Sequence, residues 1–326
     1  MQLSVHQKHV GLTAPFRVAF GIVDGLDAIQ VRAEQDGAIG WGECCPMGIY
    51  GQSPEATLHE IQAVLPAIAS GALDRAGLQT AMPAGPARNA LDCALWDLEA
   101  KRSGRSAWRM VGLDAPDAIA SDVTIGILSP AETVRAAEAR RDASMIKLKL
   151  GGEQDLDCVR AVRAVLPSVP LFVDANAGWT LDQLNRLAPA LADAGVFMIE
   201  QPLPPDQDAA LDGYNRAVPL CADESCHHRG DLDRLAGRFD YVNIKLDKAG
   251  GLTEALALAE AAQARGFRLM TGCMLGTGIA MAPAYIVASL SEVVDLDAPL
   301  IVKDPDDAGL RHDGRVVHLF GPELWG

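Results

Sequence analysis

The sequence predicts an α/β protein in which a closed parallel barrel follows a smaller α+β domain. From Ser121 onward a short apolar run, a polar break and an Ala/Leu-rich helix recur about every 25 residues, which is the pattern of repeated βα units. Eight such runs occur, a number that closes a barrel. An open doubly wound sheet is the competing layout, but no glycine-rich phosphate turn follows the first run.

Each element of this layout has its own signal. The expected barrel strands are short and apolar: 123–127, 145–150, 171–174, 197–200, 220–223, 241–245, 268–272 and 293–296. Before them, extended runs at 3–10 and 28–34 and helices at 53–69 and 84–102 indicate the small domain. Both helices have proline near the first turn, where its missing N–H costs little. After the last strand, 311–319 is predicted to form a hairpin that could return to the small domain.

Composition and charge exclude several classes of protein. The chain has 326 residues, of which 49% are hydrophobic and 22% charged, as in ordinary soluble proteins. Its net charge of -15 is spread along the sequence, which disfavours binding to nucleic acid or anionic membranes. We find no signal-peptide pattern and no apolar run of about eighteen residues. The seven cysteines include no CxxC pair, so we expect a cytoplasmic protein.

Three carboxylates end consecutive predicted strands. Asp174 in LFVDAN, Glu200 in FMIEQPL and Asp223 in LCADES are spaced 26 and 23 residues apart. Because the carboxyl ends of barrel strands meet at one rim, these side chains should converge there. Oxygen ligands on rigid strands suit Mg2+ better than Zn2+. The alternative for each residue is a cap on the following helix, but three in consecutive units favour a metal site.

Three lysines are expected at the same rim. Lys147 and Lys149 alternate along MIKLKL, so both share one face of the strand, and in a barrel that face is the lumen. A solvated basic face, the alternative, fits an antiparallel sheet better than a parallel barrel. Lys245 ends the sixth strand and approaches the lumen from the opposite side. Two lysines would then flank one ligand.

Lysines beside a bound cation suit proton transfer next to a carboxylate. A partly desolvated lysine near a cation has a lowered pKa and can accept a proton near neutral pH. Removal of a proton beside a carboxylate builds an ene-diolate, whose charge a divalent cation and the ammonium group of Lys147 could stabilise. The residues therefore predict acid/base chemistry around one Mg2+ ion per chain.

The motifs KLKLGG, DANAGW, EQPL, ADES and NIKLDKAGG, with GWGECCP and YGQSPE nearer the N-terminus, resemble the enolase superfamily and, within it, the muconate-lactonizing subgroup. The resemblance runs essentially from end to end. It implies a modified TIM barrel, (β/α)7β, over 116–304, and an N-terminal α+β capping domain formed by 1–115 with a return segment, 305–326. It also implies Mg2+ on the three carboxylates, Lys149 and Lys245 as the acid/base pair, and Lys147 as the oxyanion stabiliser.

The last predicted strand helps to identify the substrate. The subgroup includes muconate cycloisomerases, o-succinylbenzoate synthases, N-acylamino acid racemases and dipeptide epimerases, and the motifs above are common to all of them. Asp295 and Asp297 in VVDLDAP resemble the pair with which dipeptide epimerases hold the substrate's ammonium group, and alternation places both on one face. A solvated strand end or a turn at Asp297 is the alternative. The phrase TGCMLGTGIA is similar to bacterial L-Ala-D/L-Glu epimerases, and its Cys273 and Met274 are predicted to line the substrate pocket.

The capping domain bears on the second residue of a dipeptide. In the L-Ala-D/L-Glu enzymes an arginine soon after a PF pair meets the glutamate side chain, whereas the matching position in PFRVAFGIVDG is Phe20. Arg17 lies three residues earlier, on the opposite face of an extended segment. Phe20, with Met47, Ile49 and Tyr50, would favour an apolar or small second residue. The alternative places Phe20 in the core of the domain.

The motifs and the resemblance together predict an isomerase, a Mg2+-dependent dipeptide epimerase. It would invert the α-carbon of the second residue of L-Ala-D/L-Glu or of a more apolar dipeptide, through an ene-diolate intermediate and two-lysine 1,1-proton transfer. Asn176 is expected to support the metal shell, and Glu224 to do the same or to cap a helix. Alternatives are a muconate-type cycloisomerase, an N-acylamino acid racemase, an o-succinylbenzoate synthase or, from another class, a non-catalytic peptide-binding barrel. The expected partner is a small-molecule dipeptide rather than nucleic acid or membrane, and assembly into a homo-oligomer is left open.

Overall fold

Eight parallel strands form one sheet in the computed structural model, which describes residues 1–18, 21–303 and 310–326. Each strand pairs in parallel with the next along the chain. They are β5 (Val123–Ile125), β6 (Ile146–Lys149), β7 (Leu171–Asp174), β8 (Val196–Glu200), β9 (Leu220–Ala222), β10 (Tyr241–Ile244), β11 (Arg268–Gly272) and β12 (Val293–Asp295). The eight predicted strands are thus confirmed, with ends that differ by at most two residues.

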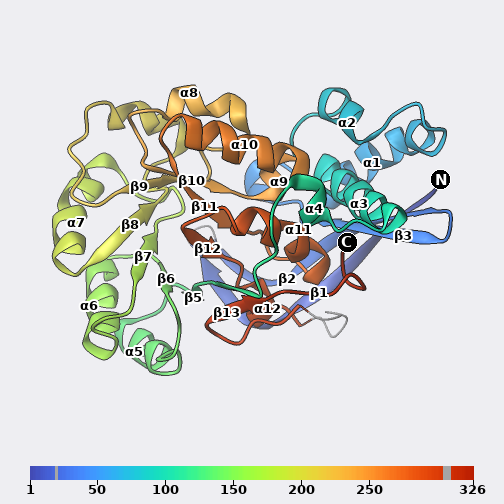
Figure 1. Cartoon of the computed structure of the whole chain (residues 1–326). Coiled ribbons are helices and arrows are strands. Elements are labelled where there is room, and N and C mark those ends of the chain that lie inside the picture. The colour runs from blue at the N-terminus through green and yellow to red at the C-terminus, as the bar shows by residue number, and fades with distance from the viewer. Residues whose placement is uncertain (19–20, 304–309) are drawn as a thin grey trace.

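Helices and short 3-10 turns connect the strands and cover the outside of the sheet (Figure 1). They are α5 (Pro130–Glu138), α6 (Asp155–Val165), α7 (Leu181–Asp193), η2 (Pro205–Leu211), η3 (Arg229–Asp231), α8 (Leu232–Leu235), α9 (Leu246–Ala249), α10 (Leu252–Ala264), α11 (Gly278–Ala288) and α12 (Ala298–Ile301). Capping boxes at Ser129 and Thr180 fix the starts of α5 and α7. In the described part of the chain, none of the helices has both the length and the apolar character that a membrane span needs.

The junction between β12 and β5 is bridged by backbone and side-chain hydrogen bonds. The N–H of Asp122 donates to a carbonyl of β12 at 2.9 Å. One step further, the N–H of Thr124 donates to the carboxylate of Asp297 at 2.7 Å. We call this junction, 121–124 against 294–297, the seam. The sheet is therefore nearly closed into the predicted barrel, with a backbone bond and polar side chains joining its two edges at the seam.

The N-terminal domain consists of an antiparallel sheet with helices packed on it. Its elements are β1 (Gln2–Val18), β2 (Gly21–Gln35), β3 (Ala38–Cys44), η1 (Gly48–Tyr50), α1 (Pro54–Ala69), α2 (Arg75–Ala81), α3 (Pro86–Ser103) and α4 (Ala107–Val111). Helix α3 lies so close to β3 that a Cβ atom at Gly42 would stand 2.0 Å from the carbonyl oxygen of Ala90. Only glycine permits this approach. The long β1–β2 hairpin reaches past the helices to the barrel (Figure 1), where the N–H of Lys303 donates to the carbonyl of Gly11 at 2.8 Å.

Sequence reasoning found only part of this domain. Both predicted helices are present: α1 begins after its N-cap Ser53, and α3 covers most of 84–102. Strand β3 was not predicted, because AIGWGEC contains Gly40 and Gly42 and glycine is depleted in strands. The short helices α2 and α4 were also missed, since neither is long enough to show a clear period.

The segment that follows the barrel turns at Asp313-Gly314, and the N–H of His318 donates back to the carbonyl of Arg311 at 2.9 Å. Its strand β13 (Val316–His318) also pairs with β4 (Ala118–Ala120), just before the barrel. Beyond it, the indole N–H of Trp325 donates to the carbonyl of Trp41 at 3.0 Å. The chain thus contacts the N-terminal domain again, while the division of the chain into domains by residue number stays a prediction.

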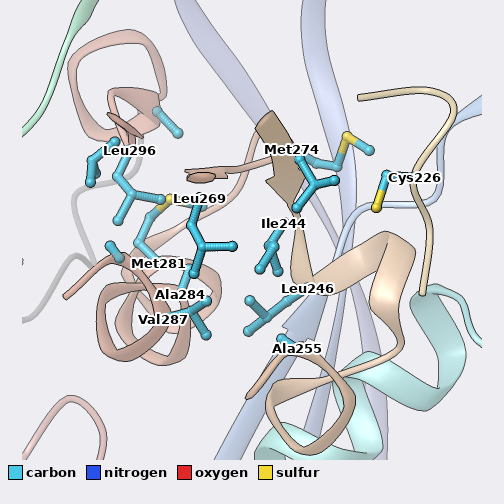
Figure 2. Packing of buried hydrophobic residues seen from close by; sticks show 14 of the residues in the cluster. Cys226, Ile244, Leu246, Ala255, Leu269, Met274, Met281, Ala284, Val287 and Leu296 are labelled. Atoms are coloured by element: carbon cyan, nitrogen blue, oxygen red, sulfur yellow. The ribbon is translucent and has the colours of Figure 1, made fainter. Parts of the chain in front are cut away.

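Apolar side chains fill the space on both sides of the barrel wall. Figure 2 shows Ile244 of β10 and Leu269 of β11 packed near the α11 side chains Met281, Ala284 and Val287. Inside the barrel a separate cluster, which we call the plug, closes the lower lumen: Phe172, Met198, Cys221, Tyr241, Met270 and Val293. The plug leaves the other end, where the strands have their C-termini, as the place where polar groups gather. We call that end the mouth.

Candidate active site

The lumen changes from apolar to polar one step above the plug. Because strand residues alternate between the lumen and the helices, the residue two positions after a plug residue also faces the lumen. The side chains that form this polar layer are all buried: Lys147, Asp174, Glu200, Asp223, Asn243 and Asp295. The mouth is therefore a layer of charged and amide groups above an apolar plug.

Lys147 lies at the centre of an ion-pair network. Its Nζ atom is 2.7 Å from the carboxylates of Glu200 and Asp295 and 3.1 Å from that of Asp174. Burial lowers the pKa of Lys147, but Asp295, Glu200 and Asp174 outweigh burial and hold the pKa well above its usual value. Lys147 is thus a fixed cation in the mouth, suited to stabilise negative charge on a ligand.

Lys149 and Lys245 lie on opposite sides of the mouth, because β6 and β10 are four positions apart in the eight-stranded order. Lys149 Nζ is 2.6 Å from the carboxylate of Asp174, and Lys245 Nζ is 2.7 Å from that of Asp223. Burial lowers the pKa of Lys245, but Asp223 outweighs it and raises the pKa well above its usual value. This direction is opposite to the lowering that the sequence suggested, since a buried carboxylate lies at contact distance from the amine.

Two further polar residues of the mouth escaped the sequence reasoning. Lys248 Nζ is 2.5 Å from Asp223, so this carboxylate contacts two buried lysines. Burial raises the pKa of Asp223, but Lys245 and Lys248 reverse this and hold it well below its usual range. Asn243 donates from Nδ2 to the carboxylate of Glu200 at 2.8 Å. Lys248 follows Lys245 by about one helical turn, which could have placed it on the same side. Asn243 lies two residues before Lys245 on the strand and therefore on the same face.

Asp174, Glu200 and Asp223 stand on three neighbouring strands, and Asp174 is in register with Glu200. Burial, reinforced by Asp174, raises the pKa of Glu200 to about 7. Three buried carboxylates side by side repel one another unless cations lie among them. Their all-oxygen donor set on rigid strands fits a hard divalent cation such as Mg2+.

Residues around the three carboxylates orient them. Asn176 donates from Nδ2 to Asp174 at 3.2 Å and to Glu224 at 3.3 Å, and its backbone has a positive φ of 44°. Burial and Asp223 raise the pKa of Glu224 to about 8. Gln201, which sequence reasoning missed, accepts from the N–H of Asp223 at 2.9 Å and is fully buried. The strand ends are therefore held by amide side chains next to each acid.

Asp295 and Asp297 lie at the seam side of the mouth, and both are buried. Asp295 contacts Lys147, while Asp297 accepts from the N–H of Thr124. Burial and Asp295 raise the pKa of Asp297 to about 6. Two acids on one face thus form an anionic patch, and neither is a solvated strand end.

A pocket of about 110 Å³ lies between the charged layer and the capping domain. The residues predicted to meet the substrate that line it are Met47, Ile49, Tyr50, Cys273, Met274, Asp295 and Asp297, together with Lys147, Lys149 and Lys245. Val23, Leu275 and Ile301, which the sequence did not single out, add to its apolar wall. Arg17 lines a neighbouring cavity of about 1330 Å³ instead. Phe20 lies outside the described residues.

The arrangement of a capping domain over a parallel barrel, with lysines and carboxylates at the mouth, defines the class of protein. Residues 1–112 match the mandelate racemase / muconate lactonizing enzyme N-terminal domain, and residues 131–313 match the enolase C-terminal domain-like family. The chain belongs to the enolase superfamily, as its motifs predicted.

Named relatives lie among the epimerases of this superfamily. The chain is 43% identical to the L-Ala-D/L-Glu epimerase of Escherichia coli over 310 residues, 94% of this chain and 96% of the relative. It is 34% identical to a hydrophobic dipeptide epimerase of Roseobacter litoralis, over 94% of this chain and 93% of the relative.

Solved structures agree with these relatives. An enolase family member from Agrobacterium tumefaciens, with bound sodium and L-Ala-L-Glu, is 39% identical and superposes with a TM-score of 0.96 over 99% of each chain. A dipeptide epimerase from Enterococcus faecalis, complexed with Mg and L-Leu-L-Tyr, is 27% identical with a TM-score of 0.89, over 98% of this chain and 96% of that one. Similar proteins thus include binders of both acidic and apolar dipeptides.

Proposed function

We propose that this protein is a Mg2+-dependent dipeptide epimerase that inverts the α-carbon of the second residue. The observation that supports this most is that Lys149 and Lys245 line one pocket from strands on opposite sides of the barrel. Inversion of a carbon requires that a proton leave one face and that another return on the opposite face. Two amines on opposite sides meet this requirement, and the epimerase relatives support the same reaction.

The mouth supplies the other parts of the reaction. The three carboxylates on β7, β8 and β9 would hold Mg2+, which when bound supplies positive charge for the substrate carboxylate. Lys149 and Lys245 exchange the α-proton on the two faces of the substrate. Lys147 stabilises the negative charge that develops as the ene-diolate forms, because its own positive charge is fixed by its ion pairs. Asn176 donates to Asp174 and is itself held by Glu224, so the two residues keep the acid oriented.

The amino end of the dipeptide binds at Asp295 and Asp297. Both acids line the pocket on the seam side, so an ammonium group there faces two carboxylates. A muconate-type cycloisomerase would place a second substrate carboxylate in the same pocket, where these acids repel it. N-acylamino acid racemases and o-succinylbenzoate synthases act on substrates without a free ammonium group, so the acidic pair favours a dipeptide over their substrates as well.

The second residue of the dipeptide is apolar or small in this proposal. The side chains of Met47, Ile49, Met274 and Ile301 give the pocket an apolar wall. Among the described residues that line the pocket, the cationic side chains are lysines, and each of them already contacts a carboxylate. A glutamate side chain would therefore lose hydration without gaining a free cation.

The test is α-deuterium exchange in D2O with Mg2+ across a library of L,L-dipeptides, read by mass spectrometry. We expect exchange at the second residue of dipeptides with apolar or small side chains there, and epimerised product in the same samples. Exchange into Ala-Glu would show that the pocket admits an acidic side chain. No exchange with any dipeptide would overturn the epimerase proposal. If the wild type shows no turnover and Lys149→Ala still binds a dipeptide, the protein is better described as a binding protein.

The cysteines bear on where the protein works. All seven are free, and most are buried. Burial raises the pKa of Cys44 and Cys93 well above the usual value, which keeps these thiols protonated and unreactive. This supports the proposal of a reducing, cytoplasmic environment.

A further inference from the structure

Asp122, in the seam, has a buried carboxyl group with no hydrogen-bond partner. The residue is fully buried, and among the described residues neither of its carboxyl oxygens is bonded. An oxygen of Asp122 and one each of Asp295 and Asp297 lie within 4.8 Å of one another. An unpaired buried carboxyl group costs free energy and contributes nothing to the fold in return. A side chain that destabilises the fold in this way calls for another role.

The surroundings of Asp122 decide its protonation state. It faces Asp295 at the end of β12 and Asp297 just beyond it, Lys147 from β6 and Glu200 from β8, and His312 lies beside its backbone. Burial, Asp295 and Asp297 raise the pKa of Asp122 well above its usual value, which Lys147 only partly offsets. These surroundings favour the protonated form of the carboxyl group, which has one O–H donor.

We propose that Asp122 is a positioning residue for the ammonium-binding pair: its buried carboxyl group, which has an oxygen within 4.8 Å of an oxygen of each, donates a hydrogen bond to Asp295 or Asp297 and so holds the pair in place. The inference rests on the proposed function, because it assigns Asp122 to the subsite for the substrate's amino end. Asp122 does not line the pocket, whereas both members of the pair do. It therefore acts through them rather than on the substrate.

The pair needs such a donor. Asp297 has one N–H donor from Thr124, and its pKa of about 6, raised by burial and by Asp295, lies close to neutrality. A donor to a carboxylate favours the ionised form. The spacing of the three acids allows Asp122 to reach either partner with a small side-chain rotation. A second metal ion among these acids is the competing reading, and the number of Mg2+ ions bound per chain distinguishes the two.

The test compares Asp122→Leu, which has no donor, with Asp122→Asn, which keeps N–H donors, using the Mg2+-loaded enzyme and a dipeptide that the wild type epimerises. Loss of one charge-assisted hydrogen bond predicts a KM about tenfold higher for Asp122→Leu, with kcat nearly unchanged. The rise should be larger at pH 6 than at pH 8, since Asp297, whose pKa is about 6, is then more easily protonated. Asp122→Asn should stay within about threefold of the wild type. The N-acetyl dipeptide, which has no ammonium group, should bind equally to all three.

A structural role would give a different result. Asp208 is a matched control, because it too is a buried acid with an unbonded oxygen, but it contacts Arg234 away from the mouth. Asp208→Asn should leave KM unchanged. Asp122→Leu should melt close to the wild-type temperature, because the burial cost that it removes offsets the hydrogen bond that it loses.

Three results would overturn the inference: a lower melting temperature for Asp122→Leu with unchanged KM, an equal rise in KM for the Asn and Leu variants, or a second Mg2+ per chain in calorimetry that Asp122→Leu abolishes. Unchanged KM in both variants with normal exchange in the wild type refutes only this inference. Absence of exchange in the wild type refutes the proposed function itself.

Discussion

The two sides of the barrel mouth hold their lysines differently. On the β6 side Lys149 contacts one carboxylate, that of Asp174. On the β10 side Lys245 shares Asp223 with a second buried lysine, Lys248. Asp174 also lies 3.1 Å from Lys147, but Lys147 is shared with Glu200 and Asp295, each at 2.7 Å. Asp223 therefore keeps a close cation of its own when Lys245 moves, whereas Asp174 keeps only a shared one when Lys149 moves. The two acid/base lysines, alike in type, thus lie in different electrostatic surroundings.

The β10 side is also tied to the capping domain. Asp247, two residues after Lys245, accepts from the N–H of Cys45 at 3.0 Å and from Asn89 at 3.2 Å. On the β6 side Lys149 lines both the small pocket and the neighbouring larger cavity. The capping domain thus holds the segment that follows Lys245, while Lys149 faces the more open side of the mouth.

The largest expected effect separates the two lysines. Lys149→Ala and Lys245→Ala should each reduce epimerisation by about a thousandfold or more, because either loss removes the proton carrier of one face. Each variant should still exchange the α-proton of one epimer with D2O, and the two variants should act on opposite epimers. Exchange measured by NMR with L,L and L,D dipeptides checks this. Loss of both exchanges in either variant would mean that the lysines do not serve separate faces.

Next in size is a difference in stability between the two sides. Asp223→Asn leaves two buried lysines without their carboxylate and should destabilise the fold by about 3–5 kcal/mol. Asp174→Asn should cost less, because Lys147 keeps its contacts with Glu200 and Asp295. Urea unfolding of both variants in EDTA gives the two free energies of unfolding. Equal costs would contradict the distinction drawn between the sides.

Glu200 lies between the two sides of the mouth. Its raised pKa predicts that the stability of the protein depends on pH, an effect of intermediate size. Burial and Asp174 raise its pKa in the folded protein from 4.5 to about 7, so in this window the folded state holds a proton that the unfolded state has released. Stability of the EDTA-treated protein should therefore fall as pH rises from about 5 to 8. Glu200→Gln and saturating Mg2+ should each flatten this slope in thermal unfolding. An unchanged slope in Glu200→Gln would assign it to other groups.

The smallest expected effect tests the contact of the capping domain with the segment that follows Lys245. Asp247→Ala removes the acceptor of the Cys45 N–H and should lower kcat about fivefold, as Lys245 becomes less well placed. Asp97→Asn is the control, since Asp97 accepts from Trp41 and Gly326 but not from groups beside Lys245. It should change the melting temperature and not kcat. A similar fall in kcat for both variants would point to general loosening instead.

The barrel could be predicted because its signals are local. Each strand is a short apolar run. Because residues two apart share one face of a strand, Lys147 lies on the same face as Lys149, and Asp295 on the same face as Asp297. In a barrel that face is the lumen. The three carboxylates follow by the same logic from the ends of consecutive strands. Their roles in metal binding and catalysis stay predictions.

The parts that sequence reasoning missed depend on contacts between distant segments. The bond from Thr124 to Asp297 spans 173 residues and exists only because the barrel closes. The same holds for Asp122: nothing in SDVTIG indicates that its carboxyl group is buried without a hydrogen-bond partner among the described residues. Lys248 needs the position of helix α9 relative to Asp223. Strand β3 is stabilised by close packing on α3, which its glycines allow. The same glycines make its sequence look unlike a strand.

The alternation of plug and polar layer also limits how this protein can evolve. An insertion of one residue within a barrel strand would turn the lysines and carboxylates outward against the helices and bring apolar side chains into the mouth. Insertions in the loops around Met47 and Ile49 or after β11 leave that register intact. Natural descendants of this chain should therefore differ in loop length while their strand lengths stay constant, and new substrates should arise through the loops.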